Sequence, residues 1–106
     1  MIARTWGGRV PRAHAADFHR HLLETGVADY RRQPSCLETW LWRRDADGWA
    51  HFLLVSVWRD MAAVRGYAGS AVDSAVLYPG DARFGLVPDT TATHYEVVAL
   101  DPPGAT

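Results

Sequence analysis

Histidine, tyrosine and tryptophan side chains set among apolar residues are the groups in this chain best suited to chemistry. His19 stands out, because a helical projection at about 100° per residue places it near the middle of an apolar face formed by Ala15, Phe18, Leu22, Leu23, Val27 and Tyr30. A histidine directed at a sheet from such a face can change its protonation near neutral pH and act as a general base. The structural alternative is a partly buried histidine bonded to a backbone carbonyl. The same projection places His21 toward the polar flank, where we expect it to be solvated.

Hydroxyl and guanidinium groups elsewhere can hydrogen-bond to a bound anion. Tyr67 and Tyr78 carry hydroxyl groups, and Arg83 lies in a loop where its guanidinium can clamp an anionic oxygen. His94 and Glu96 are two residues apart in the last expected strand, so their side chains are expected to point to the same face of the sheet. Each of these side chains also has a structural interpretation, in core packing, in a solvated loop or at the end of a sheet. The residues alone leave both interpretations open.

Several familiar chemistries lack their sequence motifs. No GxGxxG follows a strand, so a dinucleotide site of the Rossmann type is not expected. No GxSxG or HExxH motif is present, and no Cys/His cluster has the spacing of metal ligands, so we expect no metal site. All basic residues are arginines, which excludes a lysine Schiff base.

Composition indicates one globular domain that acts on neither nucleic acid nor membrane. The chain has 106 residues and a formal net charge of -1, so nothing in its charge favours binding to polyanions. Cys36 is the single cysteine, which fits a reducing compartment. The start of the chain is too polar for a signal peptide, and no apolar run has the length of a membrane span. We therefore expect a cytoplasmic protein.

Hydrophobic periodicity predicts alternating strands and helices. The expected elements, in order, are a strand at Ile2–Arg9, a helix at Arg12–Arg32 that Gly26 can interrupt, strands at Cys36–Arg44 and Trp49–Trp58, a helix at Met61–Ala68, a short helical stretch at Ser70–Leu77, a type II turn at Tyr78–Asp81 and a strand at Thr91–Leu100. Asp60 is the expected cap of the second helix and Gly69 its stop. The domain is predicted to span residues 1–100, and residues 101–106 to form a disordered tail.

The order βαββαβ is that of the ferredoxin-like α+β fold, with two helices on one face of a four-stranded antiparallel sheet. The pattern of apolar and polar residues along the strands indicates whether the other face of the sheet meets water. Phe52–Val55 and Trp40–Trp42 are apolar at both parities, so both faces of the sheet are predicted to be apolar. A second copy of the chain is the simplest cover for the free face, and we predict a homodimer whose sheets face one another.

This layout resembles the dimeric α+β barrel superfamily and, more narrowly, the antibiotic biosynthesis monooxygenase (ABM) domain family. The resemblance rests on MIARTWGGRV, on Tyr30-Arg31 before Gln33-Pro34, on FLLVSVWRD, on YPGDARF and on THYEVV, and spans roughly Met1–Leu100. It implies a pocket between the sheet and the helices, with Trp58 in its wall. We expect catalytic roles for His19, Trp58, Tyr67 and Arg83, and substrate contacts from Trp6, Phe18, Leu22, Tyr78 and His94.

Two positions depart from the family pattern. Many ABM domains have a glutamate two residues before the strand-closing tryptophan, where this chain has Ser56. Many also carry a histidine on the following helix, whose counterpart here is Tyr67, and haem-degrading members use a histidine in this region as the iron ligand. A haem cofactor is therefore not favoured, although a tyrosinate ligand stays open in principle.

The resemblance implies a cofactor-independent oxygenase that acts on an aromatic or polyketide-derived small molecule in secondary metabolism. In such a reaction the substrate loses a proton and its anion reduces dioxygen, so the protein supplies a base, hydrogen-bond donors and a dry pocket. The alternatives are a cyclase or isomerase that uses the same anion, and a non-catalytic dimer that binds haem or a small hydrophobic ligand.

Overall fold

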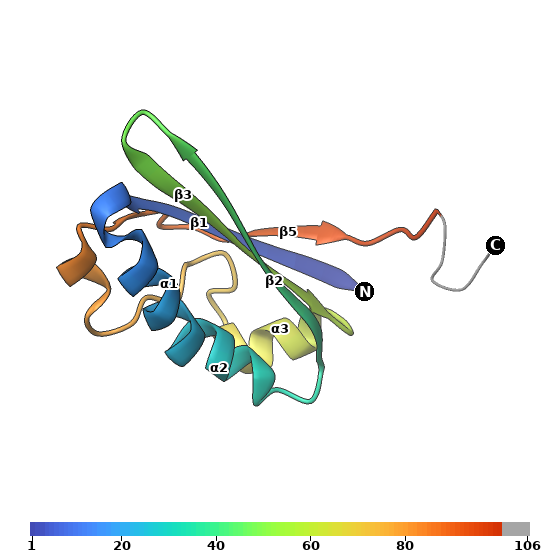
Figure 1. Ribbon diagram of the computed structural model, residues 1–106. Helices are drawn as coiled ribbons and strands as arrows, with labels where there is room; N and C mark the ends of the chain where they lie inside the picture. Colours follow the sequence, from blue (N-terminus) through green and yellow to red (C-terminus); the bar gives the residue numbers. More distant parts are fainter. Residues whose placement is uncertain (101–106) are drawn as a thin grey trace.

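Three long antiparallel strands form most of the sheet. The computed structural model describes residues 1–100, so the tail predicted at 101–106 lies outside the described residues. The long strands are β1 (Ile2–Pro11), β2 (Cys36–Ala46) and β3 (Trp49–Trp58), and two short strands follow, β4 (Val87–Pro88) and β5 (Thr93–Glu96). Their order is β2-β3-β1, and both β4 and β5 pair with the free edge of β1 (Figure 1).

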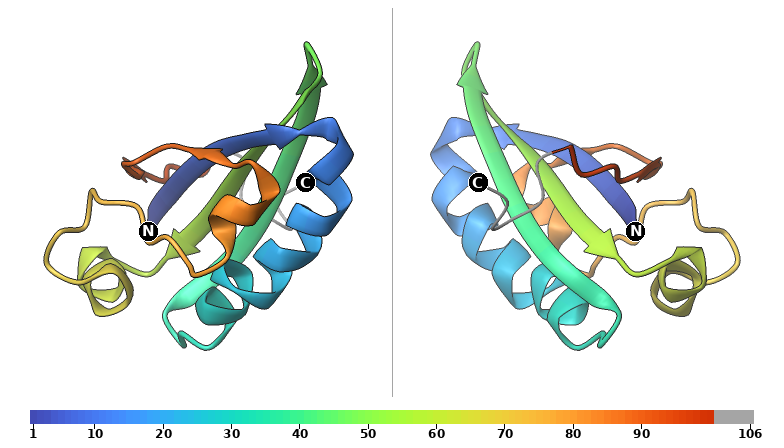
Figure 2. Two further views of the ribbon diagram at one scale, coloured as in Figure 1. Left: turned by 90° about the vertical axis from the view of Figure 1, so that its left-hand side faces the viewer. Right: turned by 90° about the vertical axis from the view of Figure 1, so that its right-hand side faces the viewer.

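Helices cover one face of this sheet, as the two side views in Figure 2 show. They are η1 (Arg12–His14), α1 (Ala15–Glu24), α2 (Gly26–Arg31), α3 (Met61–Ala68) and η2 (Asp81–Phe84). Asp60 caps α3 by accepting a hydrogen bond from the Ala63 N–H, and Gly69 ends it with a φ of 82°. The predicted ferredoxin-like α+β fold is confirmed.

The predicted long helix is divided at Thr25, one residue before the glycine expected to interrupt it. Thr25 has φ -113° and ψ -93°, which is not helical, and its hydroxyl donates to the His21 carbonyl at 2.9 Å. Gly26 is buried there, and a Cβ on it would lie 3.6 Å from Leu54 and 3.7 Å from Tyr78. The division lets α2 turn a new set of residues toward the sheet.

Two expectations for the second half of the chain are wrong. Ser70–Leu77 is not helical, because its backbone groups bond to other elements: Ser74 bridges to Thr91, and the Ala75 N–H donates to the Thr90 carbonyl. The last strand is shorter than predicted. The type II turn at Tyr78–Asp81 is confirmed, with the Asp81 N–H bonded to the Tyr78 carbonyl and Gly80 at φ 88°.

Alternation along the strands separates two different faces. The inner face, toward the helices, includes Trp6 on β1, Leu54 and Trp58 on β3, all of them buried. The residues that alternate with these point to the outer face. They include Trp40 and Trp42 on β2, Leu53 and Val55 on β3, and Tyr95 on β5. Trp40, Trp42 and Tyr95 are each more than half exposed, so the free apolar face predicted from the sequence is present.

Candidate functional site

A small cavity lies between the inner face of the sheet and the helices, where the family resemblance places a pocket. Its lining residues come from every layer of the fold: Arg4, Trp6, Leu22, Gly26, Tyr30, Leu54, Tyr67, Val76, Tyr78 and Asp81. The space measures about 20 Å³, which is room for about one water molecule. The cavity is therefore closed in this conformation.

Arg4 is the buried charge of this cavity. Its side chain projects from the inner face of β1 and is 2% exposed. Nη1 donates to the Val72 carbonyl at 2.6 Å and Nη2 to the Ser74 carbonyl at 3.1 Å, whereas the buried Nε has no partner. Arginine is charged in proteins, so the cavity holds a positive charge with one N–H unused.

His94 contacts this guanidinium from β5. Its Nε2 lies 2.9 Å from Nη1 of Arg4, and its Nδ1 lies 3.3 Å from Asp73. Because arginine has no acceptor, Nε2 must accept and Nδ1 must carry the proton that faces Asp73. Burial, together with the charge of Arg4, lowers the pKa of His94, which is consistent with a neutral ring.

Three aromatic rings pack together beside the cavity. Tyr30 and Tyr67 meet edge to face with centroids 4.9 Å apart, and Trp58 lies 5.7 Å from Tyr30 and 5.5 Å from Tyr67. Trp58 is fully buried, and its indole N–H donates to Ser56 Oγ at 2.8 Å. Ser56, at the position of the glutamate common in the family, therefore holds Trp58 in place, and this N–H is not available to a ligand.

A chain of hydroxyl groups leads from the cavity to a carboxylate. The Tyr67 and Tyr78 oxygens are 2.9 Å apart, and the Tyr78 hydroxyl donates to Asp29 on α2 at 2.6 Å. Since Tyr78 gives its proton to Asp29, Tyr67 must donate to Tyr78, which leaves the Tyr67 oxygen as an acceptor. Burial is the main cause that raises the pKa of both tyrosines. Donating to Tyr78 raises the pKa of Tyr67 further, whereas for Tyr78 the bond to Asp29 raises the pKa and the bond accepted from Tyr67 lowers it, so both stay neutral.

His19, the histidine expected to point at the sheet, does not do so. His19 is exposed on α1, whereas His21 is buried and bonds to Asp81 with Nε2 to Oδ1 at 2.6 Å. The projection that favoured His19 treated Arg12–Arg32 as one helix and so combined Val27 and Tyr30 with the face of α1. The break at Thr25 changes the phase, and the buried face of α1 is centred near Phe18.

The structure brings together four of the predicted site residues in the cavity wall, namely Trp6, Leu22, Tyr67 and Tyr78. His94 reaches the cavity only through Arg4, and Trp58 stands behind Tyr67. Phe18 lies instead in the core against Phe52 and Phe84. Arg83 is exposed on η2, with its guanidinium 4.7 Å from the ring of Phe84, and does not reach the cavity.

Sequence reasoning missed three residues of this site. Arg4 carried a usable signal, because it has the same strand parity as Trp6 and so had to point inward. Tyr30 was placed on the apolar helix face but was given no role. The sequence around Asp29 gives no indication of a role in the site. Asp29 joins the hydroxyl chain only because the fold brings it to Tyr78, 49 residues later in the chain.

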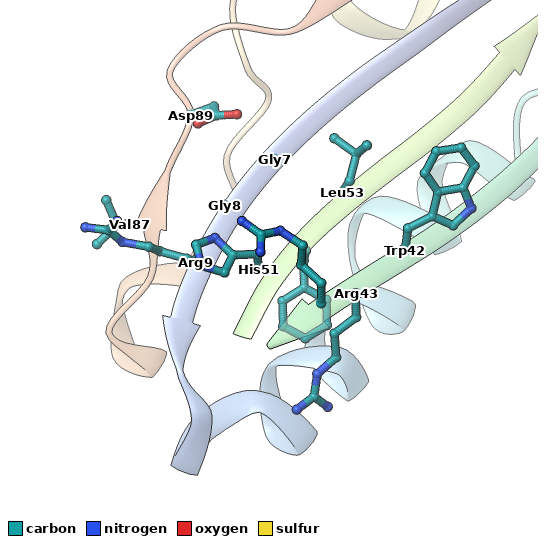
Figure 3. A pocket seen from close by; sticks show the side chains of 11 residues that line it. Gly7, Gly8, Arg9, Trp42, Arg43, His51, Leu53, Val87 and Asp89 are labelled. Atoms are coloured by element: carbon teal, nitrogen blue, oxygen red, sulfur yellow. The ribbon is translucent and has the colours of Figure 1, made fainter. Parts of the chain in front are cut away.

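A second, larger hollow of about 590 Å³ lies on the outer face of the sheet (Figure 3). Arg9, Trp42, His51 and Leu53 project around it, and Gly7 and Gly8 of β1 also line it. This hollow is broad and open to solvent, and its cations are surface side chains. We regard the inner cavity as the candidate site despite its smaller size, because it encloses a buried charge with an unused donor.

Residues 1–100 contain no group of three or more His, Cys, Asp or Glu side chains arranged to hold a metal ion. Over the same residues, no helix combines the length and apolar character needed to cross a membrane.

Comparison with known proteins agrees with this architecture. Residues 7–73 match the family of the antibiotic biosynthesis monooxygenases. The match covers more than half of the chain, so this protein belongs to the ABM family. No curated protein matches the chain.

Solved structures share the fold at low sequence identity. A protein from Deinococcus radiodurans assigned as an antibiotic biosynthesis monooxygenase is 20% identical, with a TM-score of 0.67 over 98% of this chain and 100% of that one. A mutant of MhuD with two manganese protoporphyrin IX molecules bound per active site is 18% identical, with a TM-score of 0.63 over 98% and 100% of the two chains. Rv0793 from Mycobacterium tuberculosis is 19% identical, with a TM-score of 0.54 over 93% and 97%. At these identities the comparisons establish the fold alone.

The residues of this cavity do not fit a haem. The helix position at which a haem ligand is expected holds Tyr67, and a tyrosinate ligand requires a phenol that ionises readily. Burial raises the pKa of Tyr67, and its hydroxyl is bonded to Tyr78.

Proposed function

We propose that this protein is a cofactor-independent, monooxygenase-like enzyme that binds a small phenolic or polyketide-like aromatic molecule in the inner cavity. The observation that carries this proposal is Arg4, a buried cation with an unused N–H at a cavity walled by Trp6, Tyr30 and Tyr67. An unused donor in a low-dielectric site stabilises an anion more strongly than the same group does in water. Aromatic walls favour a flat substrate.

The proposed reaction takes its electrons from the substrate. A phenolic substrate with an activated methylene loses a proton, and Arg4 stabilises the resulting anion. Oxidation of the methylene to a ketone then releases four electrons, which reduce one dioxygen: one oxygen atom enters the ketone and the other leaves as water. The chain's own contribution is to hold the anion, exclude water and receive the first proton.

The hydroxyl chain is the best candidate for receiving that proton. A substrate proton that moves to Tyr67 displaces the Tyr67 proton to Tyr78, and the Tyr78 proton then moves to Asp29. Neither tyrosine has to ionise, which agrees with their raised pKa values. Asp29 is about one-third exposed and can pass the proton to solvent. His19, exposed on the far side of α1, has no path to the cavity and is not proposed as the base.

The outer face supports a homodimer as part of this proposal. Exposed Trp40, Trp42 and Tyr95 share that face with Leu53 and Val55. Covering such a patch with a second copy of the same surface removes apolar area from water on both subunits.

A matched pair of tyrosine variants tests the proposed reaction. With 1,8-dihydroxyanthrone as the probe, we expect the wild-type protein to consume one dioxygen per substrate, as measured with an oxygen electrode and by product absorbance. Tyr67→Phe keeps the ring but removes the first proton acceptor, so kcat is expected to fall about a hundredfold. Tyr95→Phe makes the same change on the outer face and is expected to leave kcat unaltered.

Two results would count against this assignment. No turnover of a panel of anthrones and phenols by the wild-type protein excludes the oxygenase. Consumption of substrate without oxygen uptake indicates instead that the same anion serves a cyclase or isomerase reaction.

A further inference from the structure

The inner cavity cannot admit an aromatic substrate without movement of its wall. Its volume of about 20 Å³ compares with about 300 Å³ or more for pockets that hold small organic ligands. Strands and packed helices form most of the wall. The exceptions are Val76 and Tyr78, which lie in the irregular segment between α3 and η2. Figure 2 shows this segment, in yellow to orange, on the helix side of the sheet.

Backbone hydrogen bonds to other elements fix the segment near its ends but not in its middle. On the α3 side, Arg4 binds the Val72 and Ser74 carbonyls, and the Ala75 N–H donates to the Thr90 carbonyl. On the η2 side, Phe84 is buried against Phe18, with ring centroids 5.6 Å apart. Between these anchors, no backbone hydrogen bond joins residues 76–80 to another part of the described chain, beyond the turn and the start of η2. A short stretch between two fixed ends has the construction of a hinged loop.

Side-chain contacts hold this middle stretch against the helices. The Tyr78 hydroxyl donates to Asp29 on α2 at 2.6 Å and lies 2.9 Å from the Tyr67 hydroxyl on α3. Tyr78 thus connects the loop to two helices through one oxygen atom. A hydrogen bond to a charged acceptor is stronger than a neutral one, so the bond to Asp29 is the stronger of the two that the Tyr78 hydroxyl makes.

We propose that residues 76–80 form a lid over the inner cavity, with the Tyr78 hydroxyl as its latch on Asp29 and Tyr67. Opening breaks both hydrogen bonds and exposes the cavity, and closing restores them. Because Tyr78 is also the middle link between Tyr67 and Asp29, the route for the substrate proton exists only when the lid is closed. This second role rests on the proposed function, whereas the movement of the lid does not.

Access to a buried thiol measures lid opening without any substrate. Cys36→Ser removes the native thiol, and Leu22→Cys then places one in the cavity wall, at a side chain that is 4% exposed. A thiol reagent is expected to modify this cysteine about tenfold faster when Tyr78→Phe is added, since the stronger latch bond is lost. Val10→Cys, in a fully buried position of β1 away from the loop, is the control and is expected to react at one slow rate with or without Tyr78→Phe.

Equal rates of modification for Leu22→Cys with and without Tyr78→Phe would overturn the lid. A Val10→Cys rate that rises in parallel would also overturn it, because such a rise indicates that the whole fold has loosened. With 1,8-dihydroxyanthrone, Tyr78→Phe is expected to lower kcat about a hundredfold while access to the cavity becomes faster. Faster thiol access without anthrone turnover by the wild-type protein supports the lid and removes only the proposed reaction. Faster access with unchanged kcat supports the lid and overturns its part in proton transfer.

Discussion

The two faces of the sheet place the same residue types in opposite situations. Arg4 and Arg9 lie on one strand, yet Arg4 points inward and is buried, whereas Arg9 points outward over the ring of Trp49 at 4.5 Å. Tyr67 sits in the inner cavity, and Tyr95 stands exposed on the outer face. The side chain alone therefore does not decide the role. The role depends on the face of the strand or helix from which the side chain projects, because a buried polar group needs a hydrogen-bond partner in the protein and an exposed one can bond to water.

Each face has a different energetic demand. Inside, every buried polar group needs a partner, and the carbonyls of Val72 and Ser74 are satisfied by Arg4. Outside, the demand is for apolar contact, because Trp40 and Trp42 leave more than half of their surface in water. Apart from Arg4 Nε, the buried polar side chains of the inner face have partners within one chain, whereas the aromatic rings of the outer face remain exposed.

Replacement of Arg4 should produce the largest effect. Arg4→Met removes the hydrogen bonds that the Val72 and Ser74 carbonyls accept from a buried, charged donor, and we expect a loss of about 3 kcal/mol in the free energy of unfolding, measured by urea denaturation. Arg9→Met makes the same change at the exposed outward position and should cost about 0.5 kcal/mol or less. Similar losses in the two variants would remove the distinction between the faces.

A charge on the outer face should disrupt the proposed dimer. Trp42→Glu places a carboxylate in the interface once from each subunit, so we expect the dissociation constant to rise about a hundredfold, measured by analytical ultracentrifugation. Leu23→Glu alters an exposed leucine on α1, on the opposite side of the molecule, and should leave dissociation unchanged. A wild-type protein that stays monomeric at high concentration would show that another partner covers this face.

Alkaline pH should destabilise the inner face in particular. Burial raises the pKa values of Tyr30, Tyr67 and Tyr78 above 10.0, so the folded state keeps protons that the unfolded state loses. Stability is therefore complete below about pH 10 and falls as the pH rises further. Tyr78→Phe removes one such group, and urea denaturation between pH 10 and 11 should show a slope smaller by about 1 kcal/mol per pH unit. An unchanged slope would mean that Tyr78 ionises as easily in the folded protein as in the unfolded chain.

Local patterns predicted most elements of the fold. Strand parity, the cap at Asp60 and the turn at Tyr78–Asp81 depend on neighbouring residues, and the structure contains all three. The stretch Ser70–Leu77 has a local preference for helix, but Arg4 and the strand near Thr91 bind its backbone. Tertiary hydrogen bonds outweigh a weak local propensity in such a stretch.

The candidate site was predictable only in part, for a geometric reason. Tyr67 and Tyr78 were identified as donors of hydroxyl groups, and both line the cavity. The choice of His19 over His21 failed because a single residue, Thr25, ends one helix and starts another with a different phase. A wheel drawn through such a break rotates the apparent apolar face and exchanges buried and exposed positions.

The sequence by itself determined the order of strands and helices, the alternation of inward and outward side chains, and the apolar character of both faces of the sheet. Those properties follow from backbone geometry and from residues that are close in the chain. Only the tertiary structure decided which polar groups meet. Arg4 donates a hydrogen bond to the Val72 carbonyl, 68 residues later in the chain, and Asp29 accepts one from Tyr78, 49 residues later. Hydrogen bonds act over about 3 Å, so partners this distant along the chain are fixed only when the whole fold has packed.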